Sequence, residues 1–439
     1  MRFLYSFLIR CAVPFAYVLI LWRGLRDRSY WQGLGERLGF GKTISAPGIW
    51  LHAVSLGEMS AAAPLLSALR TRHPNLPLLV TTATPAGRAR ARALLGAGAD
   101  IRFLPYDTPG AVRRFLARTR PRGAVIMETE LWPNLLRECE RRGVPVLLAS
   151  ARLSMKSVSR YRCFGNLFSG VFSKNLFVAA QTAADAERFR AIGSLGGQTQ
   201  VVGNVKFDLQ LDPGIENTGR MLRDSYGAAG ASYGAARFVW IAGSTHPGEE
   251  EQVLDAHAVL QASDPNALLV LVPRHKDRFA GVADLLARRG VVFARRSVTQ
   301  VLPQGTQVLL ADTLGELPAL YASADVAFVG GSLVAIGGHN LLEPAALGLP
   351  VLTGPSYFNS LEIAQLLLAR GAALQVMNGQ DLAAQLKRLL GRPAECRRIG
   401  AIGREIVAAN RGSALRLLAL IEPWLPAEHR SAAAEAGYR

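Results

Sequence analysis

Short apolar runs alternate with amphipathic segments along most of the chain. From residue 49 onward, each apolar run is long enough for a buried strand and too short for a helix. The pattern predicts strands at residues 49–54, 76–81, 101–104, 123–127, 145–149, 176–180 and 199–202, and then at 238–242, 267–272, 291–294, 308–311, 326–329 and 351–352. Helices are expected between them, among others at residues 57–72, 85–95, 109–118, 133–142, 249–260, 381–390 and 405–420. This alternation is typical of an α/β fold with open, mostly parallel sheets.

One polar, glycine-rich stretch divides the pattern in two. Residues 208–236 are expected to form a linker that holds one short helix. The predicted organisation is an apolar helix at residues 1–28, a first domain at 29–205, a linker at 206–236, a second domain at 237–425 and a disordered tail at 426–439. Both domains are predicted to be doubly wound and Rossmann-like and to face a cleft. Ligands of such sheets bind beyond the carboxyl ends of the strands.

The first segment of the chain is apolar enough to meet a membrane. Residues 3–22 can just span a bilayer, which needs about 20 residues. Arg23, Arg26 and Arg28 follow directly, so the positive-inside rule places the body of the protein in the cytosol. Arg10 is costly at membrane depth unless it reaches the headgroups, so a helix lying in the membrane surface is the alternative to a single-pass anchor. Both alternatives predict a membrane-bound protein.

The net charge of the chain limits the classes of partner that the protein is expected to bind. Fifty lysine and arginine residues against 33 acidic ones give a net charge of +17, which favours nucleic acid, an acidic membrane surface or a phosphorylated substrate. Neither a nucleic-acid-binding motif nor a surface pattern of basic and aromatic residues is found, so no nucleic acid partner is expected. The four cysteines are scattered, which argues against a zinc site or a disulfide framework and fits a reducing compartment.

Several loops that follow strands of the second domain carry residues suited to an anion. Ser244 and Thr245 come directly after one strand and could bind a phosphate or carboxylate, or simply cap a helix. Pro273 and Arg274 follow the next strand, and Arg274 is either a phosphate ligand or a solvated side chain. The backbone of residues 312–317 could bind the edge of a nucleobase.

A fourth loop contains paired glycines between a strand and a helix. Gly338 belongs to the second pair, and its neighbour Asn340 is placed to cap the helix. Glycines let backbone N–H groups approach an anion, and the helix N-terminus adds partial positive charge. Glu343 either completes a capping box with Asn340 or accepts both hydroxyls of a ribose. Together the four loops predict a nucleotide site.

Two residues at strand ends of the first domain, and one where the two domains join, are candidates for chemistry. Glu58 is expected in the first turn of a helix, where it is either a general base or a carboxylate that stabilises the helix start. Glu128 lies at the end of another strand. Lys206 could contact a developing negative charge, or form an ion pair with Asp208 or another acid.

These motifs, in this order, resemble the Kdo transferases of lipopolysaccharide assembly, where Kdo is 3-deoxy-D-manno-octulosonic acid. The resemblance covers nearly the whole chain and is carried by GERLGF (35–40), HAVSLGE (52–58), METELWPN (127–134), ARLS (151–154), GNVKFD (203–208), GSTHPGEE (243–250), LVPRH (271–275), DTLGEL (312–317) and FVGGSLVAIGGHNLLEP (328–344). It implies a GT-B-fold glycosyltransferase that moves Kdo from CMP-Kdo to the lipid A precursor. The first domain would then bind the acceptor and the second the CMP-sugar, on the cytoplasmic side of the inner membrane.

The resemblance also implies roles for matching residues. Glu58 would be the general base, and Glu128 and Lys206 would stabilise the transition state. The CMP-binding segments would be Pro273 and Arg274, then Leu314, Gly315 and Glu316, then Asn340, Leu341, Leu342 and Glu343. The reaction would need neither cofactor nor metal and would proceed with inversion. A covalent intermediate would require Glu128 as nucleophile and is disfavoured.

Basic residues of the first domain suggest contacts with the acceptor. The expected partners are CMP-Kdo, a phosphorylated lipid A precursor and an anionic membrane surface. The candidates for binding acceptor phosphates are Arg88, Arg152, Arg160 and Arg162, each with a solvated position as the alternative. The rival function is another GT-B enzyme that uses a UDP-sugar, because a fold does not determine a function.

Overall fold

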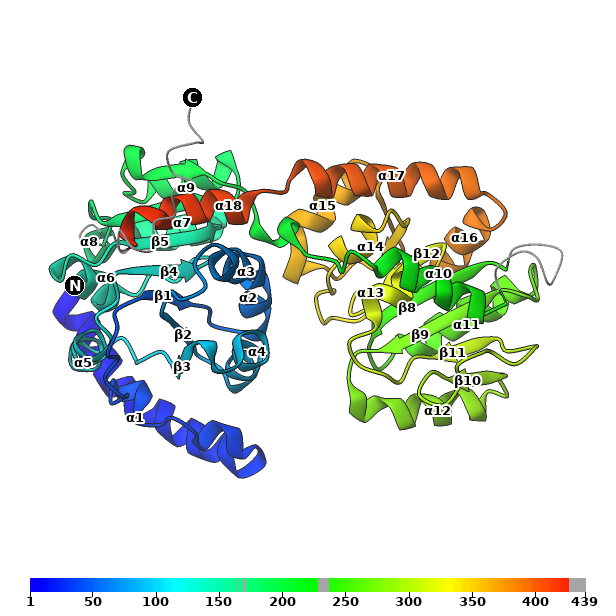
Figure 1. Cartoon of the computed structure of the whole chain (residues 1–439), viewed down its shortest axis with the longest axis horizontal. Helices are drawn as coiled ribbons and strands as arrows, with labels where there is room; N and C mark the ends of the chain where they lie inside the picture. Colours follow the sequence, from blue (N-terminus) through cyan, green and yellow to red (C-terminus); the bar gives the residue numbers. More distant parts are fainter. Residues whose placement is uncertain (164, 169–170, 228–236, 426–439) are drawn as a thin grey trace. The chain divides into compact units, whose positions relative to one another are not determined.

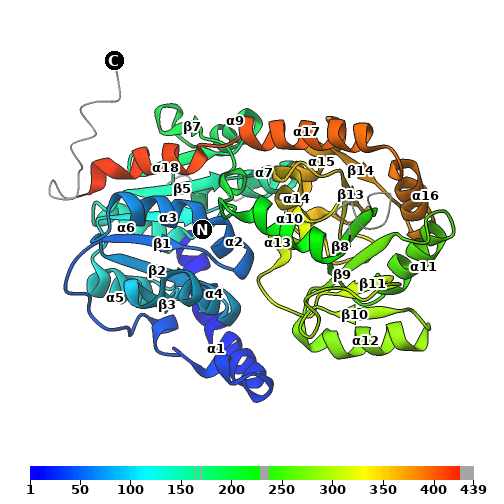
Figure 2. The same cartoon turned by 45° about the vertical axis from the view of Figure 1, so that its right-hand side comes forward.

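The chain forms two compact units. The computed structural model describes residues 1–163, 165–168, 171–227 and 237–425. Unit 1 contains Met1–Asp208 together with the chain from Asn410 onward, and unit 2 contains Leu209–Ala409. Figures 1 and 2 show that each unit is built of one sheet with helices on both faces.

Unit 1 is organised around a seven-stranded parallel sheet with the order β3-β2-β1-β4-β5-β6-β7. Its strands are β1 (Ile49–His52), β2 (Leu78–Thr82), β3 (Asp100–Phe103), β4 (Gly123–Met127), β5 (Val146–Ala151), β6 (Leu176–Ala180) and β7 (Thr199–Val201). Its α-helices are α1 (Arg2–Arg26), α2 (Leu56–Ala61), α3 (Ala63–Arg72), α4 (Pro85–Leu95), α5 (Pro109–Thr119), α6 (Pro133–Arg141), α7 (Met155–Cys163), α8 (Gly165–Phe168), α9 (Ala183–Ala191) and α18 (Ser413–Ile421).

Unit 2 repeats this architecture with the strand order β10-β11-β9-β8-β12-β13-β14, again parallel. Its strands are β8 (Val239–Thr245), β9 (Leu268–Pro273), β10 (Phe293–Arg295), β11 (Val308–Leu310), β12 (Val326–Val329), β13 (Val351–Thr353) and β14 (Ala373–Gln375). Its α-helices are α10 (Ile215–Ser225), α11 (Glu250–Gln261), α12 (Phe279–Arg288), α13 (Leu317–Ala322), α14 (Leu342–Ala346), α15 (Leu361–Ala369), α16 (Gly379–Leu389) and α17 (Pro393–Ala409).

Each sheet is buried on both faces, which explains the continuous apolar runs of its strands. Neighbouring residues of β1 show how the faces are divided. Trp50 packs with Phe115 on one face, with ring centroids 5.1 Å apart, while Leu51 belongs to the core on the other face. The two faces of the second sheet have separate cores in the same way.

Each sheet has one point where the order of the strands reverses. In unit 1 the chain passes outward through β1, β2 and β3 and then crosses back to place β4 beside β1. In unit 2 the corresponding neighbours are β8 and β12. Loops that leave adjacent strands in opposite directions open a crevice at the carboxyl ends, and ligands of open α/β sheets bind there.

The expected boundary of the second domain at residue 425 is wrong. Residues 405–420 are not one helix, because α17 ends at Ala409 and Gly412 adopts a left-handed φ of 93°. The chain beyond this break returns to unit 1, where Leu417, Leu418 and Ile421 of α18 join the core. Asp208 accepts hydrogen bonds from the backbone N–H groups of Gly412 and Ala414 and so caps the start of α18.

The expected linker is also partly wrong. Helix α10 packs into unit 2, where Leu222 and Tyr226 are buried and Arg223 forms a 3.0 Å ion pair with Asp325. Only a few positions on one side of α10 are buried. The polar composition of residues 208–236 therefore hid the apolar pattern of this helix. Residues 228–236 and the tail expected at 426–439 lie outside the described residues.

Candidate active site

Glu58 lies in the first turn of α2, just beyond the end of β1. Its Oε2 atom accepts a 2.7 Å hydrogen bond from the backbone N–H of Val54, and its own N–H donates to Ser55 Oγ at 3.3 Å. The side chain is half-buried. Burial raises the pKa of Glu58 to about 7, and the nearby charges of Glu128 and Glu130 act in the same direction. A carboxyl group with this pKa can accept a proton at neutral pH and still release it.

Glu58 also has the features of the alternative role, a carboxylate that stabilises the start of a helix. The contacts with Val54 and Ser55 form a reciprocal cap of the helix N-terminus. A cap alone lowers the pKa of a carboxylate, and the hydrogen bond from Val54 does act in that direction. Because burial outweighs it, the environment favours a proton acceptor over a permanently charged cap.

Glu128 and Lys206 form an ion pair at the carboxyl ends of the same sheet. Lys206 Nζ lies 3.2 Å from Glu128 Oε1, and both side chains remain partly exposed. Lys206 thus pairs with an acid other than Asp208. Glu128 has a φ of 55°, in the left-handed region that L residues rarely adopt. Such backbone strain persists only where the surroundings enforce it, and it is concentrated at functional sites.

A polar network fixes the position of Lys206. The Lys206 N–H donates to Asn204 Oδ1 at 3.0 Å, and Asn204 Nδ2 donates to Gln181 Oε1 at 2.9 Å. The Val205 N–H donates to Ser150 Oγ at 3.0 Å. Ser150 also has a positive φ, of 55°. Ser150 and Gln181 were not predicted from the sequence, because each is an ordinary polar residue at a strand end.

Glu58 and Glu128 flank the reversal of strand order in unit 1. Glu58 follows β1 and Glu128 follows β4, which are neighbours in the sheet. The charge of Lys206 also lowers the pKa of Glu58, whereas Glu128 raises it. The three predicted catalytic residues are therefore coupled electrostatically within one unit.

In unit 2, residues of three loops come together around Arg274. Its backbone N–H donates to the Thr245 carbonyl at 3.0 Å, which ties the end of β9 to the end of β8. Its exposed guanidinium is close enough to lower the pKa values of Glu343, His339 and His246. The sequence-based hypothesis of one site built from separate loops requires this proximity.

The Glu343 carboxylate does not complete a capping box, but it does accept a hydrogen bond. Asn340 Nδ2 donates to Glu343 Oε1 at 3.0 Å, and Asn340 Oδ1 accepts from the Leu342 N–H at 3.1 Å. The N-cap of α14 is Leu341 rather than the expected Asn340, whose side chain bonds the first N–H of the helix from one residue earlier, while Glu343 binds the Asn340 amide rather than its backbone. Burial raises the pKa of Glu343, and the hydrogen bond with Asn340 and the charge of Arg274 oppose that shift.

The loop that begins at the first glycine pair binds the side chain of a glutamate, Glu249, with its backbone N–H groups. The Glu249 carboxylate accepts backbone hydrogen bonds from Gly331, Ser332 and Leu333 at 2.7–2.9 Å and from His246 at 3.0 Å. Glu249 is fully buried, and burial raises its pKa against these four bonds. These amides are therefore engaged by Glu249, which joins the loops after β8 and β12. In the sequence Glu249 looked like a helix-start residue.

A histidine pair makes a second connection between the same loops. His246 Nε2 and His339 Nε2 lie 2.7 Å apart, with ring planes inclined by 7°. One ring must donate and the other accept, so the two cannot both be protonated while this bond exists. Burial lowers the pKa of His339 to about 4 and also lowers that of His246. The pair spans the reversal of strand order between β8 and β12.

The remaining predicted donor residues lie on the surrounding loops. Ser244 and Thr245 form the end of β8, where Ser244 has a φ of 59° and Thr245 Oγ1 donates to Glu250 Oε1 at 3.3 Å. Glu316 accepts from Arg296 at 3.0 Å and from Thr313. The others differ in their surroundings: Leu314 is exposed, Gly315 and Gly338 have positive φ, Pro273 ends β9, and Leu341 and Leu342 are buried.

Comparison with known proteins identifies the family. A sequence profile of the 3-deoxy-D-manno-octulosonic acid transferases matches residues 32–209. The 3-deoxy-D-manno-octulosonic acid transferase of Haemophilus influenzae is 39% identical over 97% of this chain and 99% of its own. That of Bordetella pertussis is 38% identical, with the same coverage. The chain belongs to the Kdo transferase family.

Solved structures support the GT-B-like fold of this Kdo transferase. The S. aureus MnaA–UDP co-structure matches with a TM-score of 0.55 over 86% of this chain and 97% of its own. Its sequence is only 13% identical, so the likeness concerns the fold. The predicted fold class, two doubly wound α/β domains, is confirmed.

The arginines suggested as acceptor contacts differ in their surroundings. Arg88 is engaged within unit 1, since Nη2 bonds Glu36 Oε1 at 3.2 Å and the guanidinium lies over the Phe103 ring at 4.8 Å. Arg160 and Arg162 are exposed on α7. Arg152 is half-buried at the end of β5. Of the four, Arg160 and Arg162 are the most accessible to a ligand.

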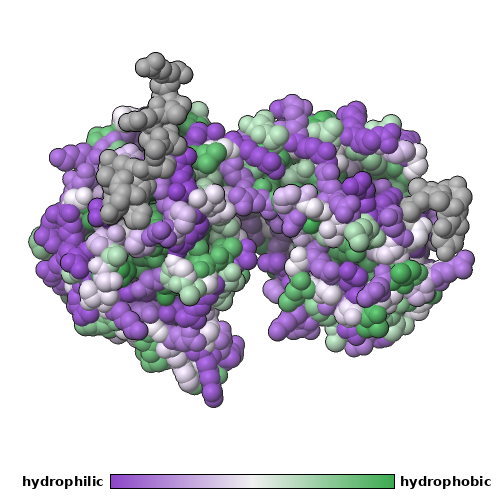
Figure 3. Space-filling model, viewed as in Figure 1, coloured by the Kyte–Doolittle hydropathy of each residue, from purple (hydrophilic) through white to green (hydrophobic). Residues whose placement is uncertain are grey.

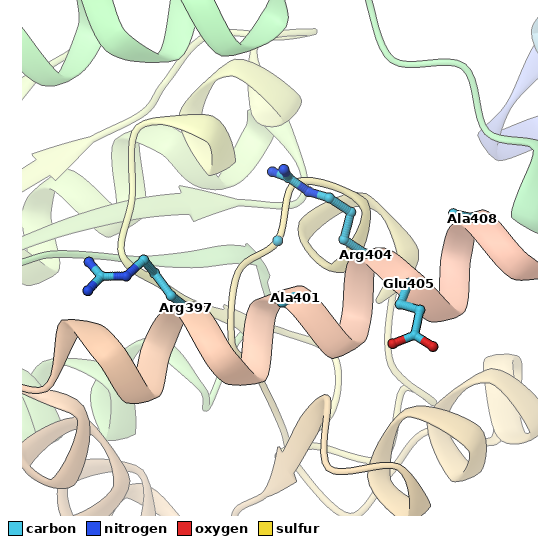
Figure 4. A pocket seen from close by; sticks show the side chains of 6 residues that line it. Arg397, Ala401, Arg404, Glu405 and Ala408 are labelled. Carbon is cyan, nitrogen blue, oxygen red and sulfur yellow. The ribbon is translucent and has the colours of Figure 1, made fainter.

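A cavity of about 410 Å³ on unit 2 is separate from these residues. Gly348 and the α17 residues Arg397, Ala401, Arg404, Glu405 and Ala408 line it (Figure 4). Arg404 Nη2 donates to the Leu347 carbonyl at 2.8 Å. None of the predicted site residues lines this cavity. Within the described parts of the chain, no group of three or more His, Cys, Asp or Glu side chains is arranged to hold a metal ion.

Proposed function

We propose that this Kdo transferase moves Kdo from CMP-Kdo to a hydroxyl of the lipid A precursor, with Glu58 as the general base. The observation that carries the proposal is the position of Glu58, half-buried in the first turn of α2 at the strand reversal of unit 1, where burial raises its pKa to about 7. A base of this pKa is half ionised at neutral pH and is matched to removing a proton from a sugar hydroxyl as it attacks.

The proposed reaction is a single displacement. The acceptor oxygen forms a bond to the anomeric carbon of Kdo, the bond from that carbon to the CMP phosphate breaks, and CMP leaves with the electron pair. Glu58 takes the acceptor proton. Attack from the face opposite CMP inverts the anomeric centre. The Lys206–Glu128 pair, 3.2 Å apart, supplies a positioned positive charge beside the base and stabilises the transition state.

Unit 2 would bind the donor nucleotide. Arg274 is exposed and supplies a charge for the CMP phosphate, while Asn340 orients Glu343 toward a ribose. The Leu314-Gly315-Glu316 turn would meet the base. CMP carries less charge than a nucleoside diphosphate, so an arginine and backbone amides can stabilise it as a leaving group.

The location proposed for this reaction is the cytoplasmic face of the inner membrane. Residues Phe3–Arg26 form one helix that is long and apolar enough to cross a membrane, judged by length and composition. The acceptor is a phosphorylated lipid, and the chain has a net charge of +17. Basic residues near an anionic leaflet each contribute about 1 kcal/mol of attraction.

Nucleotide preference and transfer test the proposal together. We expect CMP to raise the melting temperature of the full chain, with UMP and UDP having little effect, and CMP-Kdo to be consumed only when the lipid A precursor is present. Protection by UDP but not CMP, with transfer from a UDP-sugar, would overturn it in favour of another GT-B enzyme. Arg274→Ala should remove the protection by CMP, and Arg289→Ala, which changes an exposed arginine paired with Asp255, is the matched control.

A further inference from the structure

Helix α1 contacts the body of unit 1 through its first turns and its middle, and its last turns contact the segment that directly follows it. The residues that are shielded from solvent recur every three or four positions, which places them on one side of the helix. They include Tyr5, Ile9, Val13, Tyr17, Ile20 and Gly24, here called the protein-facing stripe. A helix of 25 residues is about 38 Å long, so the stripe extends over a length comparable to the thickness of a bilayer core.

Specific polar contacts hold the first turns of α1. Tyr5 Oη donates to Asp107 Oδ2 at 2.9 Å, and Ser6 Oγ donates to Asn134 Oδ1 at 3.1 Å. Asp107 and Asn134 are themselves buried, and Asp107 also accepts backbone bonds from Asn134 and Leu135 at the start of α6. The beginning of α1 is thus built into the α6 end of unit 1.

The middle and the end of α1 are held as well. Tyr17 Oη donates to the Leu34 carbonyl at 2.6 Å, and the Tyr17 ring meets the edge of Tyr106. Trp31 Nε1 donates to the Leu21 carbonyl at 3.1 Å. A Cβ atom on Gly24 would overlap the Trp31 ring, so only glycine allows this approach. Figure 1 shows the first part of α1 passing α5 and its last turns extending beyond the sheet of unit 1.

The opposite side of α1 is apolar and exposed. Its members include Phe3, Phe7, Phe15, Val18, Trp22 and Leu25, here called the exposed face. At 100° per residue the exposed face points away from the protein-facing stripe; Arg10 falls between the two, and Arg23 lies at the edge of the stripe, at the same angle as Tyr5. Figure 3 shows hydrophobic side chains on the surface that α1 forms and a hydrophilic patch at its tip.

We propose that α1 lies flat in the surface of an anionic membrane, with its exposed face in the lipid, and that it does not span the bilayer. This rests on the membrane location proposed above and not on the chemistry. A spanning helix would have to break the contacts of Tyr5, Ser6 and Tyr17 with unit 1. Lying flat, α1 keeps them and places Arg10 and Arg23 at headgroup depth, where long basic side chains are favoured.

The charge of α1 decides between lipid and a second copy of the chain. The helix contains arginines and no acidic residue, so pairing two exposed faces would bring like charges together. An anionic lipid surface instead complements them. The arrangement also explains why α1 is apolar on all sides, since one side packs on protein and the other on lipid.

Depth measurements on the full chain in vesicles with and without phosphatidylglycerol test this directly. Exposed Cys11 and Cys163, and half-buried Cys396, would be replaced by serine, and single cysteines placed at Leu4, Phe15 or Trp22 would carry a spin label. A flat helix puts all three labels at one shallow depth. A spanning helix puts the Phe15 label much deeper than the other two, and that profile would overturn the proposal.

Protease access to a tag before Met1 provides a second, independent readout. A flat α1 leaves the tag on the side of the membrane that carries units 1 and 2, so added protease removes the tag and digests the units from the same side. A spanning α1 puts the tag on the other side, where it is protected while the units are digested. Protection of the tag would contradict the proposal.

Paired substitutions measure the contribution of the exposed face. Phe15→Glu with Val18→Glu, at residues 76% and 66% exposed, should weaken binding to anionic vesicles at least tenfold. Val298→Glu with Val301→Glu, at 79% and 72% exposed on unit 2, is the matched control and should leave binding unchanged. Concentration-dependent dimers that vanish in the first variant, without vesicle binding by the wild type, would assign the face to a second copy instead.

Transfer activity in detergent separates this inference from the proposed function. Both double variants should transfer Kdo to detergent-dispersed acceptor at the wild-type rate, because neither touches Glu58 or the donor loops. A wild-type protein that binds vesicles with a flat α1 but transfers no Kdo would leave the inference standing and overturn the function. Normal Kdo transfer by a wild-type protein whose α1 spans the bilayer would overturn the inference about α1 and leave the proposed function standing.

Discussion

Glu58→Gln should stabilise the protein at pH 8 and have little effect at pH 4. The side chain keeps an oxygen that can accept the 2.7 Å hydrogen bond from the Val54 N–H, but it cannot ionise. In the wild type, burial raises the pKa of Glu58 from 4.5 to about 7. Folding therefore opposes ionisation of this carboxyl group, and the substitution removes that cost.

The sign and the pH window follow from linkage. Below pH 4.5 Glu58 is protonated in the folded and unfolded chains alike, so it contributes no pH-dependent difference. As the pH rises from 4.5 to 7, the unfolded chain ionises first and stability is lost. The shift of about 2.5 pKa units, at about 1.4 kcal/mol per unit, makes the cost above pH 7 at most about 3.5 kcal/mol. Solvent screening of the half-buried carboxylate reduces this to about 1–2 kcal/mol.

Differential scanning calorimetry at pH 4, 6 and 8 would measure the effect. For a unit of this size about 1 kcal/mol corresponds to about 2–4 °C, so we expect Glu58→Gln to raise the unit 1 transition by about 2–8 °C at pH 8. Glu187→Gln, at an exposed glutamate paired with Arg190, is the matched control and should show no such trend. A stabilisation that is equal at all three pH values, or a loss of stability at pH 8, would refute the assigned pKa of Glu58.

Three further substitutions test other parts of the account. Lys206→Met should move the acidic limb of the pH–rate profile upward, because the lysine charge lowers the pKa of Glu58, and should reduce kcat about 100-fold or more; an unchanged profile would separate Lys206 from the base. Glu249→Gln should destabilise unit 2 by about 1–3 kcal/mol, because a neutral amide cannot accept all four backbone hydrogen bonds, and urea unfolding would measure it. Leu222→Ala should destabilise unit 2 by about 2–5 kcal/mol if α10 is part of its core, and a linker helix would show almost no effect in the same urea experiment.

The strands were predictable because both faces of each sheet are buried. In β1 and β8 every position is buried, and the apolar runs at residues 49–51 and 239–242 make up the first part of each strand. The path of the chain after residue 409 was not predictable. Helices α17 and α18 carry similar amphipathic patterns, and such a pattern shows that a side is buried without showing which sheet buries it.

Candidate site residues could be recognised in the sequence where the type of residue is unusual for its position. Glu58 and Glu128 were found because carboxylates at strand ends need an explanation. Glu249 and His246 were missed as a bridge between loops, because their partners lie more than 80 residues away in the chain. An acid in the first turn of a helix has an adequate local explanation, and long-range pairing leaves no periodic signal.

The apolar N-terminal segment shows the same limit of pattern analysis. Hydropathy depends on whether a side chain avoids water, and it does not distinguish a protein neighbour from lipid. The contacts of Tyr5, Ser6 and Tyr17 with unit 1 supply that distinction. Both alternatives for α1 are therefore consistent with the sequence, and the proposal that α1 lies flat depends on these contacts.

A transfer assay with Glu58 variants shows whether Glu58 is the general base of Kdo transfer. Wild type, Glu58→Ala and Glu58→Gln would be compared with CMP-Kdo generated in the reaction and purified lipid A precursor, with CMP binding measured on each protein. We expect the wild type to add Kdo, and both variants to bind CMP normally but to transfer Kdo about 1000-fold more slowly or worse, on the order expected when a general base is lost. Near-wild-type transfer by either variant would contradict this expectation, leaving Glu58 as a helix-start carboxylate and making Glu128 the next residue to test.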